Sequence, residues 1–168
     1  MPKNLVGKLS VYLPILIIAL WIASYAHTAG TGATVRLKIT GYDPRDLLSG
    51  HYLLYNVDYG RPVDCQQEAT DWCLCLGAWE GPFSQVTEQA HCSEISECSS
   101  MLRGSCIEGR FKAGIERYYF SEEYVKQLRI VPPDSSIVVA LSPTGKGVVK
   151  DLLVKEEPVS KWAEKALK

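Results

Sequence analysis

Residues 136–154 read SIVVALSPTGKGVVKDLLV, two apolar runs on either side of a polar segment that contains glycine. Both runs are rich in Val, whose branched side chain favours strands. Pro143, Gly145 and Gly147 lie between the runs and supply the residue types that a turn requires. The stretch therefore predicts an antiparallel β-hairpin.

The chain before this hairpin carries further strand patterns. Val35, Leu37 and Ile39 alternate with polar residues, which is the period of a strand with one buried face. Strands are expected at residues 35–40, 51–59, 72–77 and 110–120, the last of them broken near Gly114. Ser121 is a suitable N-cap for a short helix at residues 122–128. The expected fold class is mainly β (α+β), with one small antiparallel domain.

An apolar segment at residues 9–29 contains no Lys, Arg, Asp or Glu. A helix that crosses a bilayer needs about 20 apolar residues, which this segment supplies. Lys3 and Lys8 precede it, so the positive-inside rule predicts a cytoplasmic N-terminus and an extracytoplasmic remainder. Trp21 and Tyr25 lie near its outer end, where amphipathic rings suit the headgroup region. A cleaved signal peptide is the alternative, and it places the remainder in the same compartment.

Six cysteines are confined to a short part of the chain: Cys65, Cys73, Cys75, Cys92, Cys98 and Cys106. In an exported chain six cysteines permit three disulfides with 15 connectivities, which sequence alone does not resolve. Cys73 and Cys75, if they share a strand, point to one face about 7 Å apart, so we expect them to bond different partners. Each disulfide typically stabilises a fold by about 2–4 kcal/mol.

Two other uses of the cysteines are weighed against structural disulfides. A zinc site with His91 is one, but no cysteine pair here has the C-x(2–4)-C spacing that structural zinc sites usually show. A thiol–disulfide exchange site is the other, and the chain lacks a C-x-x-C motif. We therefore expect neither a metal nor a cofactor, and keep redox or metal chemistry as an alternative function.

The charge is unevenly distributed along the chain. Residues 62–106 hold seven acids and one base, whereas residues 107–168 hold eleven bases and nine acids. No basic stripe with interleaved aromatic residues is present, so no nucleic-acid partner is expected. The acidic segment is interpreted as a solvated surface loop.

Three parts are expected along the chain: a membrane anchor or signal segment at residues 1–30, a β-rich extracytoplasmic domain at residues 31–155, and a charged tail at residues 156–168. The domain contains a disulfide-stapled insertion at about residues 62–106. Trp162 and Leu167 give the tail an amphipathic pattern, from which we expect one or two helical turns.

Two segments resemble a known family. Residues 43–52, DPRDLLSGHY, are similar to the hallmark region of the bacterial GDYXXLXY proteins, in which D-P-R-D, a short spacer and G-D-Y lead into a strand. Residues 114–122, GIERYYFSE, are similar to that family's second region. The resemblance covers most of residues 34–155, with the cysteine segment as an insertion. It implies a membrane-anchored protein that accompanies polytopic membrane proteins, and it implies no particular biochemical activity.

The namesake motif itself is altered in this chain. Gly50 and Tyr52 retain it, whereas His51 replaces its Asp, Tyr55 its Leu and Val57 its final Tyr. The flanking segments therefore carry the resemblance, and no role of the missing Asp is transferred to this chain.

Charged and aromatic residues gather in the two family-like segments. We name as candidate binding residues Asp43, Arg45, Asp46, Tyr52, Glu116, Arg117 and Tyr118. If the two strands pair, these side chains form either an ion-pair network at the strand entry or, with Tyr119, a polar recognition surface. Tyr and Arg are typical anchors of protein interfaces. Tyr is equally typical of sheet edges.

The expected function is a non-catalytic module that binds or stabilises a polytopic membrane protein. No catalytic residue is predicted, because no Ser lies in a G-x-S-x-G motif and His27, His51 and His91 have no catalytic motif around them. A membrane-anchored hydrolase with an unrecognised site is the second alternative.

Overall fold

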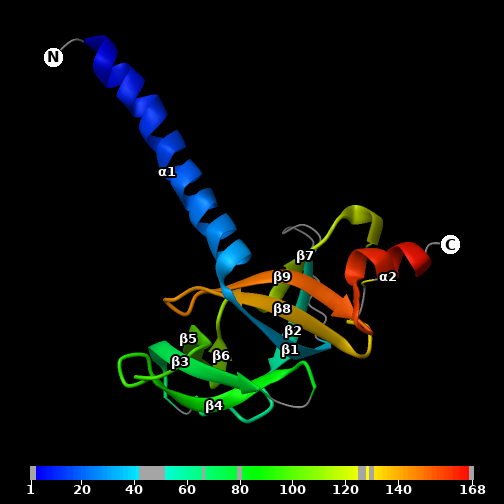
Figure 1. Ribbon diagram of the computed structural model, residues 1–168. Coiled ribbons are helices and arrows are strands. Elements are labelled where there is room, and N and C mark those ends of the chain that lie inside the picture. The colour runs from blue at the N-terminus through cyan, green and yellow to red at the C-terminus, as the bar shows by residue number, and fades with distance from the viewer. Residues whose placement is uncertain are drawn as a thin grey trace.

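The computed structural model describes residues 3–41, 52–65, 67–78, 81–124, 128 and 131–166. Helix α1 (Lys3–Thr31) projects from a domain made of two antiparallel sheets (Figure 1). The part from Tyr12 to Thr31 has a mean hydropathy of 1.5 and is not buried by the rest of the protein. By length and composition it can cross a membrane, a property that anchors share with signal sequences.

The first sheet has six strands in the order β10-β9-β8-β1-β2-β7. Their bounds are β1 (Ala33–Gly41), β2 (Tyr52–Asp58), β7 (Arg117–Tyr119), β8 (Ser135–Leu141), β9 (Gly147–Val154) and β10 (Glu157–Pro158). The predicted hairpin is confirmed as β8–β9, with an irregularity between Val138 and Val139. The strand predicted at 110–120 is two short strands, because the chain turns at Gly114, where φ is +77°.

The second sheet has four strands in the order β4-β3-β5-β6. Their bounds are β3 (Ala69–Ala78), β4 (Ser84–His91), β5 (Met101–Ile107) and β6 (Arg110–Lys112). Of these strands the sequence predicted only part of β3, at residues 72–77, and β6, which lies within the strand expected at 110–120. The interpretation of the acidic cysteine segment as a surface loop is therefore wrong. The segment contains β4 and β5, which pair with the two edges of β3.

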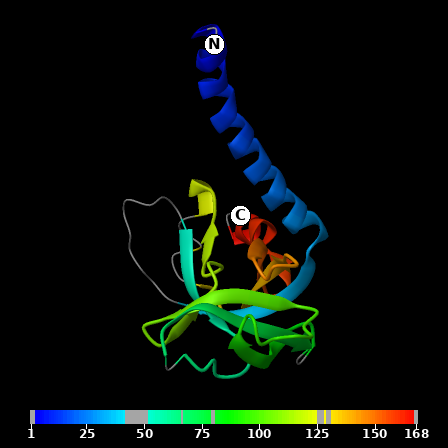
Figure 2. The ribbon, with the colours of Figure 1, turned by 90° about the vertical axis from the view of Figure 1, so that its left-hand side faces the viewer.

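One hydrophobic core holds the two sheets together. Leu37, Ile137 and Leu152 of the first sheet and Leu74 and Leu102 of the second are fully buried in the same cluster. The six-stranded sheet lies between the four-stranded sheet and the side from which α1 projects, and α2 lies on that same side (Figure 2). The fold class predicted from the sequence, mainly β with an N-terminal apolar helix, is confirmed.

The expected charged tail folds onto the domain. Strand β10 pairs with β9, and helix α2 (Val159–Ala166) follows it. Val159 and Ala163 of α2 are buried, so its apolar face packs on the core and its charged face stays exposed. At residues 122–128, where a short helix was expected, the structure has a 3-10 turn, η1 (Glu122–Tyr124), and residues 125–127 lie outside the described residues.

A single residue, Gly32, separates α1 from β1. A Cβ atom there would lie 2.6 Å from the carbonyl oxygens of both Thr28 and Leu141. The backbones of α1, β1 and β8 therefore meet at a point where only glycine fits.

Candidate functional site

Four of the predicted site residues lie together at the edge of the six-stranded sheet. Tyr52 is on β2, Arg117 and Tyr118 are on β7, and Glu116 directly precedes β7. The strands pair as the site prediction required, with Tyr52 opposite Tyr119. Asp43, Arg45, Asp46 and the strand-entry network proposed for them lie outside the described residues.

The side chains of Tyr52, Arg117 and Tyr119 share the outer face of this strand pair, and we call these three residues the aromatic edge. The ring centroids of Tyr52 and Tyr119 are 5.9 Å apart. The Arg117 guanidinium carbon lies 5.5 Å from the Tyr52 centroid, within the range of a cation–π contact. Tyr119 is 64% exposed although its ring is large and mainly apolar. β7 is the last strand of the sheet, so its outer backbone edge has no strand partner in the described structure.

Tyr118 and Glu116 take structural positions instead. Tyr118 points to the opposite face from Tyr119 and packs against the core, where burial and the charge of Asp151 raise the pKa of its phenol. Glu116 Oε1 accepts a hydrogen bond of 2.7 Å from the backbone N–H of Ala113. The candidate binding residues included Tyr118, whereas Tyr119 was named only as part of the possible recognition surface. Strand alternation alone does not say which of two adjacent tyrosines faces the solvent.

Tyr55, where the family name has Leu, is accommodated by a hydrogen bond. Its side chain is 3% exposed, and its hydroxyl donates to the carbonyl oxygen of Ile115 at 2.6 Å. Burial raises the pKa of Tyr55 far above its ordinary value, and the charge of Glu116 adds to this effect. The hydroxyl therefore remains protonated and serves as a buried donor between β2 and the segment before β7.

The six cysteines form three disulfides: Cys65–Cys106, Cys73–Cys92 and Cys75–Cys98. As predicted, the two cysteines of β3 bond different partners. Cys73–Cys92 joins β3 to the end of β4, and Cys75–Cys98 joins β3 to the segment before β5. The second sheet is thus held by covalent bonds where its strands carry few large apolar side chains.

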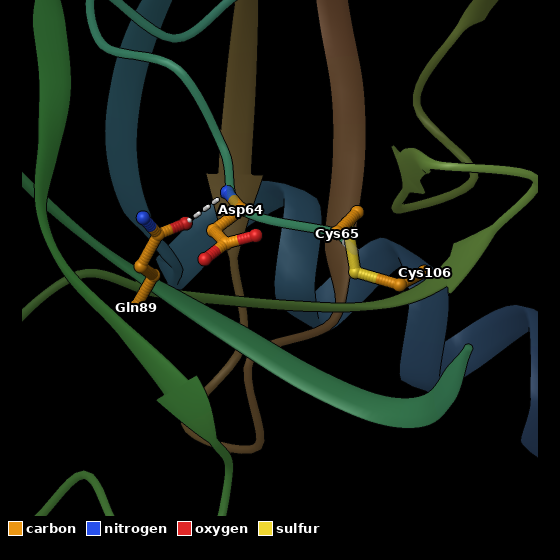
Figure 3. The surroundings of a disulfide bond; sticks show 4 residues. All are labelled: Asp64, Cys65, Gln89 and Cys106. Carbon is orange, nitrogen blue, oxygen red and sulfur yellow. Dashed lines mark hydrogen bonds between the residues drawn. A yellow bond between two sulfur atoms is a disulfide. The ribbon is translucent and has the colours of Figure 1, made fainter. Parts of the chain in front are cut away.

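The third disulfide fastens the segment between β2 and β3. Cys65 bonds Cys106 of β5, and the backbone N–H of the adjacent Asp64 donates to Oε1 of Gln89 on β4 at 2.8 Å (Figure 3). This segment is therefore fixed to two strands of the four-stranded sheet.

The described residues offer one cluster with the spacing of a metal site, made of Asp71, Cys73 and Cys92. Its two sulfur atoms are bonded to each other, and the Asp71 carboxylate pairs with the Arg103 guanidinium at 2.7 Å. A disulfide supplies no thiolate ligand, so this cluster does not have the donor set that zinc requires.

The two described histidines have structural neighbours. His27 lies on α1, where its ring Nε2 is 3.4 Å from the Thr31 hydroxyl, which donates to the His27 backbone carbonyl at 2.9 Å. The His91 ring packs edge-on against Trp72, with centroids 5.1 Å apart. Neither arrangement is a nucleophile and a base held by an orienting third group.

Neither the curated proteins nor the solved structures contain a match to this chain. Residues 14–152, which run from α1 into β9, match the family model described as "GDYXXLXY protein". The match includes the whole four-stranded sheet, and it agrees with the resemblance carried by the segments at 43–52 and 114–122. The chain belongs to the GDYXXLXY family.

Proposed function

We propose that this protein is a non-catalytic, membrane-anchored module that binds or stabilises a polytopic membrane protein on the extracytoplasmic side. In this proposal α1 crosses the bilayer with its N-terminus in the cytoplasm. Two lysines precede the apolar part of α1, and three disulfides favour an oxidising compartment for the domain.

The aromatic edge is the observation that carries the proposal. Exposed Tyr and Arg side chains supply large contact areas at low entropic cost, and they are enriched among residues that dominate binding energies. Tyr119 has its ring exposed beside Tyr52, and Arg117 lies against the same ring. The outer backbone edge of β7, which pairs with no strand that the structure describes, adds donors and acceptors next to these rings.

The position of the aromatic edge suits a partner in the membrane. β7 leads into η1, and η1 lies on the side of the domain from which α1 projects (Figure 2). With α1 in the bilayer, this side faces the membrane and the four-stranded sheet faces away from it. A polytopic protein beside α1 can therefore reach the aromatic edge through a short extracytoplasmic loop.

Site-specific photo-crosslinking in native membranes tests the proposal. A benzophenone amino acid replaces Tyr119 in the full-length chain, and the matched control carries it at Lys150, an exposed residue of β9. We expect a covalent adduct with one integral membrane protein from position 119 and none from position 150.

A second variant links the adduct to the proposed surface. Replacing Arg117 with Glu removes the cation beside Tyr52 and should reduce the yield of the adduct formed from position 119. If position 119 returns only the monomer, or if both positions return the same adducts, the proposal is wrong.

A further inference from the structure

A groove of about 850 Å³ opens where the two sheets meet beyond the end of β7. One wall is the second half of β2 with the following residues 59–63, and the other is the β5–β6 turn with β6. Arg117 and Glu116 close the end that adjoins the aromatic edge. We call this the β2–β6 groove.

The rim of the groove carries more positive than negative side chains. Its four cations are exposed and make no ion pair with any residue that the structure describes: Arg61, Arg110, Lys112 and Arg117. Two of its three carboxylates are engaged by backbone donors, since Gly60 N–H donates to Asp58 at 2.8 Å and Ala113 N–H donates to Glu116. The four cations outnumber the three carboxylates Asp58, Glu108 and Glu116 by one, so the groove has a net positive charge and favours a negatively charged occupant.

Between the walls lies an aromatic pair with an unsatisfied polar atom. Tyr59 and Phe111 pack edge to face, with centroids 5.7 Å apart, and both are buried. The buried Tyr59 hydroxyl has no hydrogen-bond partner among the described residues. Burial, and after it the charge of Glu116, raises the pKa of Tyr59, so the group stays protonated and able to donate.

The groove also exposes an unpaired stretch of β2. β7 covers β2 only as far as Leu54, and the Tyr55 N–H reaches the carbonyl of Glu116 at 3.3 Å. Backbone groups alternate sides along a strand, so the N–H and C=O of Val57 point the same way as those of Tyr55, into the groove. No described strand lies there to pair with them.

The walls are held rigid before any occupant binds. The Tyr59 carbonyl accepts a hydrogen bond of 2.9 Å from Val86 N–H on β4. Farther along the same wall, the Asp64–Gln89 hydrogen bond and the Cys65–Cys106 disulfide fix the chain to the second sheet (Figure 3). A preformed groove spares its occupant the entropic cost of ordering the protein.

We propose that the β2–β6 groove binds an extended acidic peptide segment, which adds a strand to β2 at Val57 and places its carboxylates against Arg61 and Arg110. This inference rests on the proposed function, since the segment would belong to the membrane partner that contacts the aromatic edge. The strand addition supplies affinity through the backbone, and the cationic rim supplies the selection for acidic side chains.

Fluorescence anisotropy with the full-length protein in neutral detergent tests the proposal. The probe is a fluorescein-labelled peptide of alternating Glu and Val. One control probe has Lys in place of Glu, and another is N-methylated at its central residues, which blocks strand pairing. The double variant R61E/R110E is compared with K150E, which makes the same kind of charge reversal on β9, away from the groove.

We expect the acidic probe to bind the unaltered protein and K150E alike, and R61E/R110E at least about tenfold more weakly. The Lys probe and the N-methylated probe should not bind. Equal binding of the Glu and Lys probes, no effect of R61E/R110E, or equal binding of the N-methylated probe would each overturn the inference. If the acidic peptide does not bind but the adduct at position 119 still forms, only the proposal for the groove is rejected. If the peptide binds but no adduct forms, the proposal of a membrane partner is rejected.

Discussion

The ammonium group of Lys146 lies 4.4 Å from the centroid of the Tyr25 ring, so the turn between β8 and β9 is in contact with α1. The same turn reaches the second sheet, because the Gly145 carbonyl accepts a hydrogen bond of 2.8 Å from Arg103 N–H on β5. One turn of the predicted hairpin thus contacts both the apolar helix and the disulfide-linked sheet.

A double-mutant cycle measures the contact between the turn and α1. K146A and Y25L should each destabilise the full-length protein, and their effects should couple by about 0.5–1 kcal/mol, the size of an exposed cation–π contact. The measurement is the free energy of unfolding in neutral detergent. K150A paired with Y25L is the control, and its effects should add. A coupling near zero for the Lys146 pair would contradict the contact.

Gly32 should be intolerant of any side chain. Gly32→Ala brings a Cβ to 2.6 Å from two carbonyl oxygens, and the backbone shift needed to relieve this should cost about 1–3 kcal/mol. Gly30→Ala is the matched control, since a Cβ there meets no atom within 4 Å. Thermal unfolding should therefore separate the two variants, with only Gly32→Ala melting earlier. Equal melting temperatures of the two variants would contradict the prediction, because the backbone around residue 32 would then accommodate a Cβ atom at no cost in stability.

Two buried tyrosines should respond differently to loss of the hydroxyl. Tyr55→Phe leaves the Ile115 carbonyl without its donor and should cost about 1–3 kcal/mol. Tyr59→Phe removes a hydroxyl that has no partner among the described residues, so it should leave stability unchanged or slightly raise it. Denaturant titrations of both variants check this. A larger loss for Tyr59→Phe would mean that its hydroxyl has a partner.

The disulfide connectivity is open to a direct chemical test. Proteolysis without reduction, followed by mass spectrometry, should return peptides linked as Cys73–Cys92 and Cys75–Cys98. Replacing both Cys73 and Cys92 with Ala should lower the free energy of unfolding by about 2–4 kcal/mol. A peptide in which Cys73 is bonded to Cys98 would contradict the β3 geometry.

The ion pair between Arg36 and Glu156 should make stability depend on acid pH. Both carboxylate oxygens of Glu156 accept hydrogen bonds from Arg36, one of them at 2.7 Å, and this lowers the pKa of Glu156 below its ordinary value of 4.5. A lowered folded-state pKa gives stability that is present above pH 4.5 and is lost as the pH falls through the lowered pKa.

E156Q tests this dependence. Relative to the unaltered protein, its deficit in unfolding free energy should be largest above pH 4.5 and should shrink at lower pH. E94Q is the control, because Glu94 is exposed and lies in the segment after β4, far in sequence from Glu156. A deficit of E156Q that stays constant through the acid range would rule out the ion pair as its cause.

The sequence predicted those strands that carry regular apolar patterns. Residues 136–154 and the alternation from Val35 to Ile39 both correspond to strands of the six-stranded sheet. β1 buries one face and therefore alternates, whereas β8 is buried on both faces and therefore reads as an apolar run. The same reasoning about strand faces correctly separated the partners of Cys73 and Cys75.

The missed strands lack that pattern for a physical reason. β4 buries only Val86, and most of its other side chains are polar. β5 buries Leu102 and Cys106 but includes Gly104, where a Cβ would clash with the Lys112 carbonyl. Disulfides and close backbone contact hold these strands, and neither leaves a hydrophobic period in the sequence. The aromatic edge was predicted in part: the recognition surface was proposed on the condition that the two strands pair, and β2 and β7 do pair, but the exposure of Tyr119 was not predicted.

Gly32 is the whole connection between α1 and β1, so no flexible linker separates the apolar helix from the domain. Only one residue lies between Thr31 and Ala33, so a rotation of α1 about its own axis should rotate the whole domain with it. In the proposed topology, a partner that binds α1 inside the bilayer therefore also sets the orientation of the extracytoplasmic domain about the membrane normal. Recognition between lipid-embedded helices would then decide which extracytoplasmic loop Tyr119 meets.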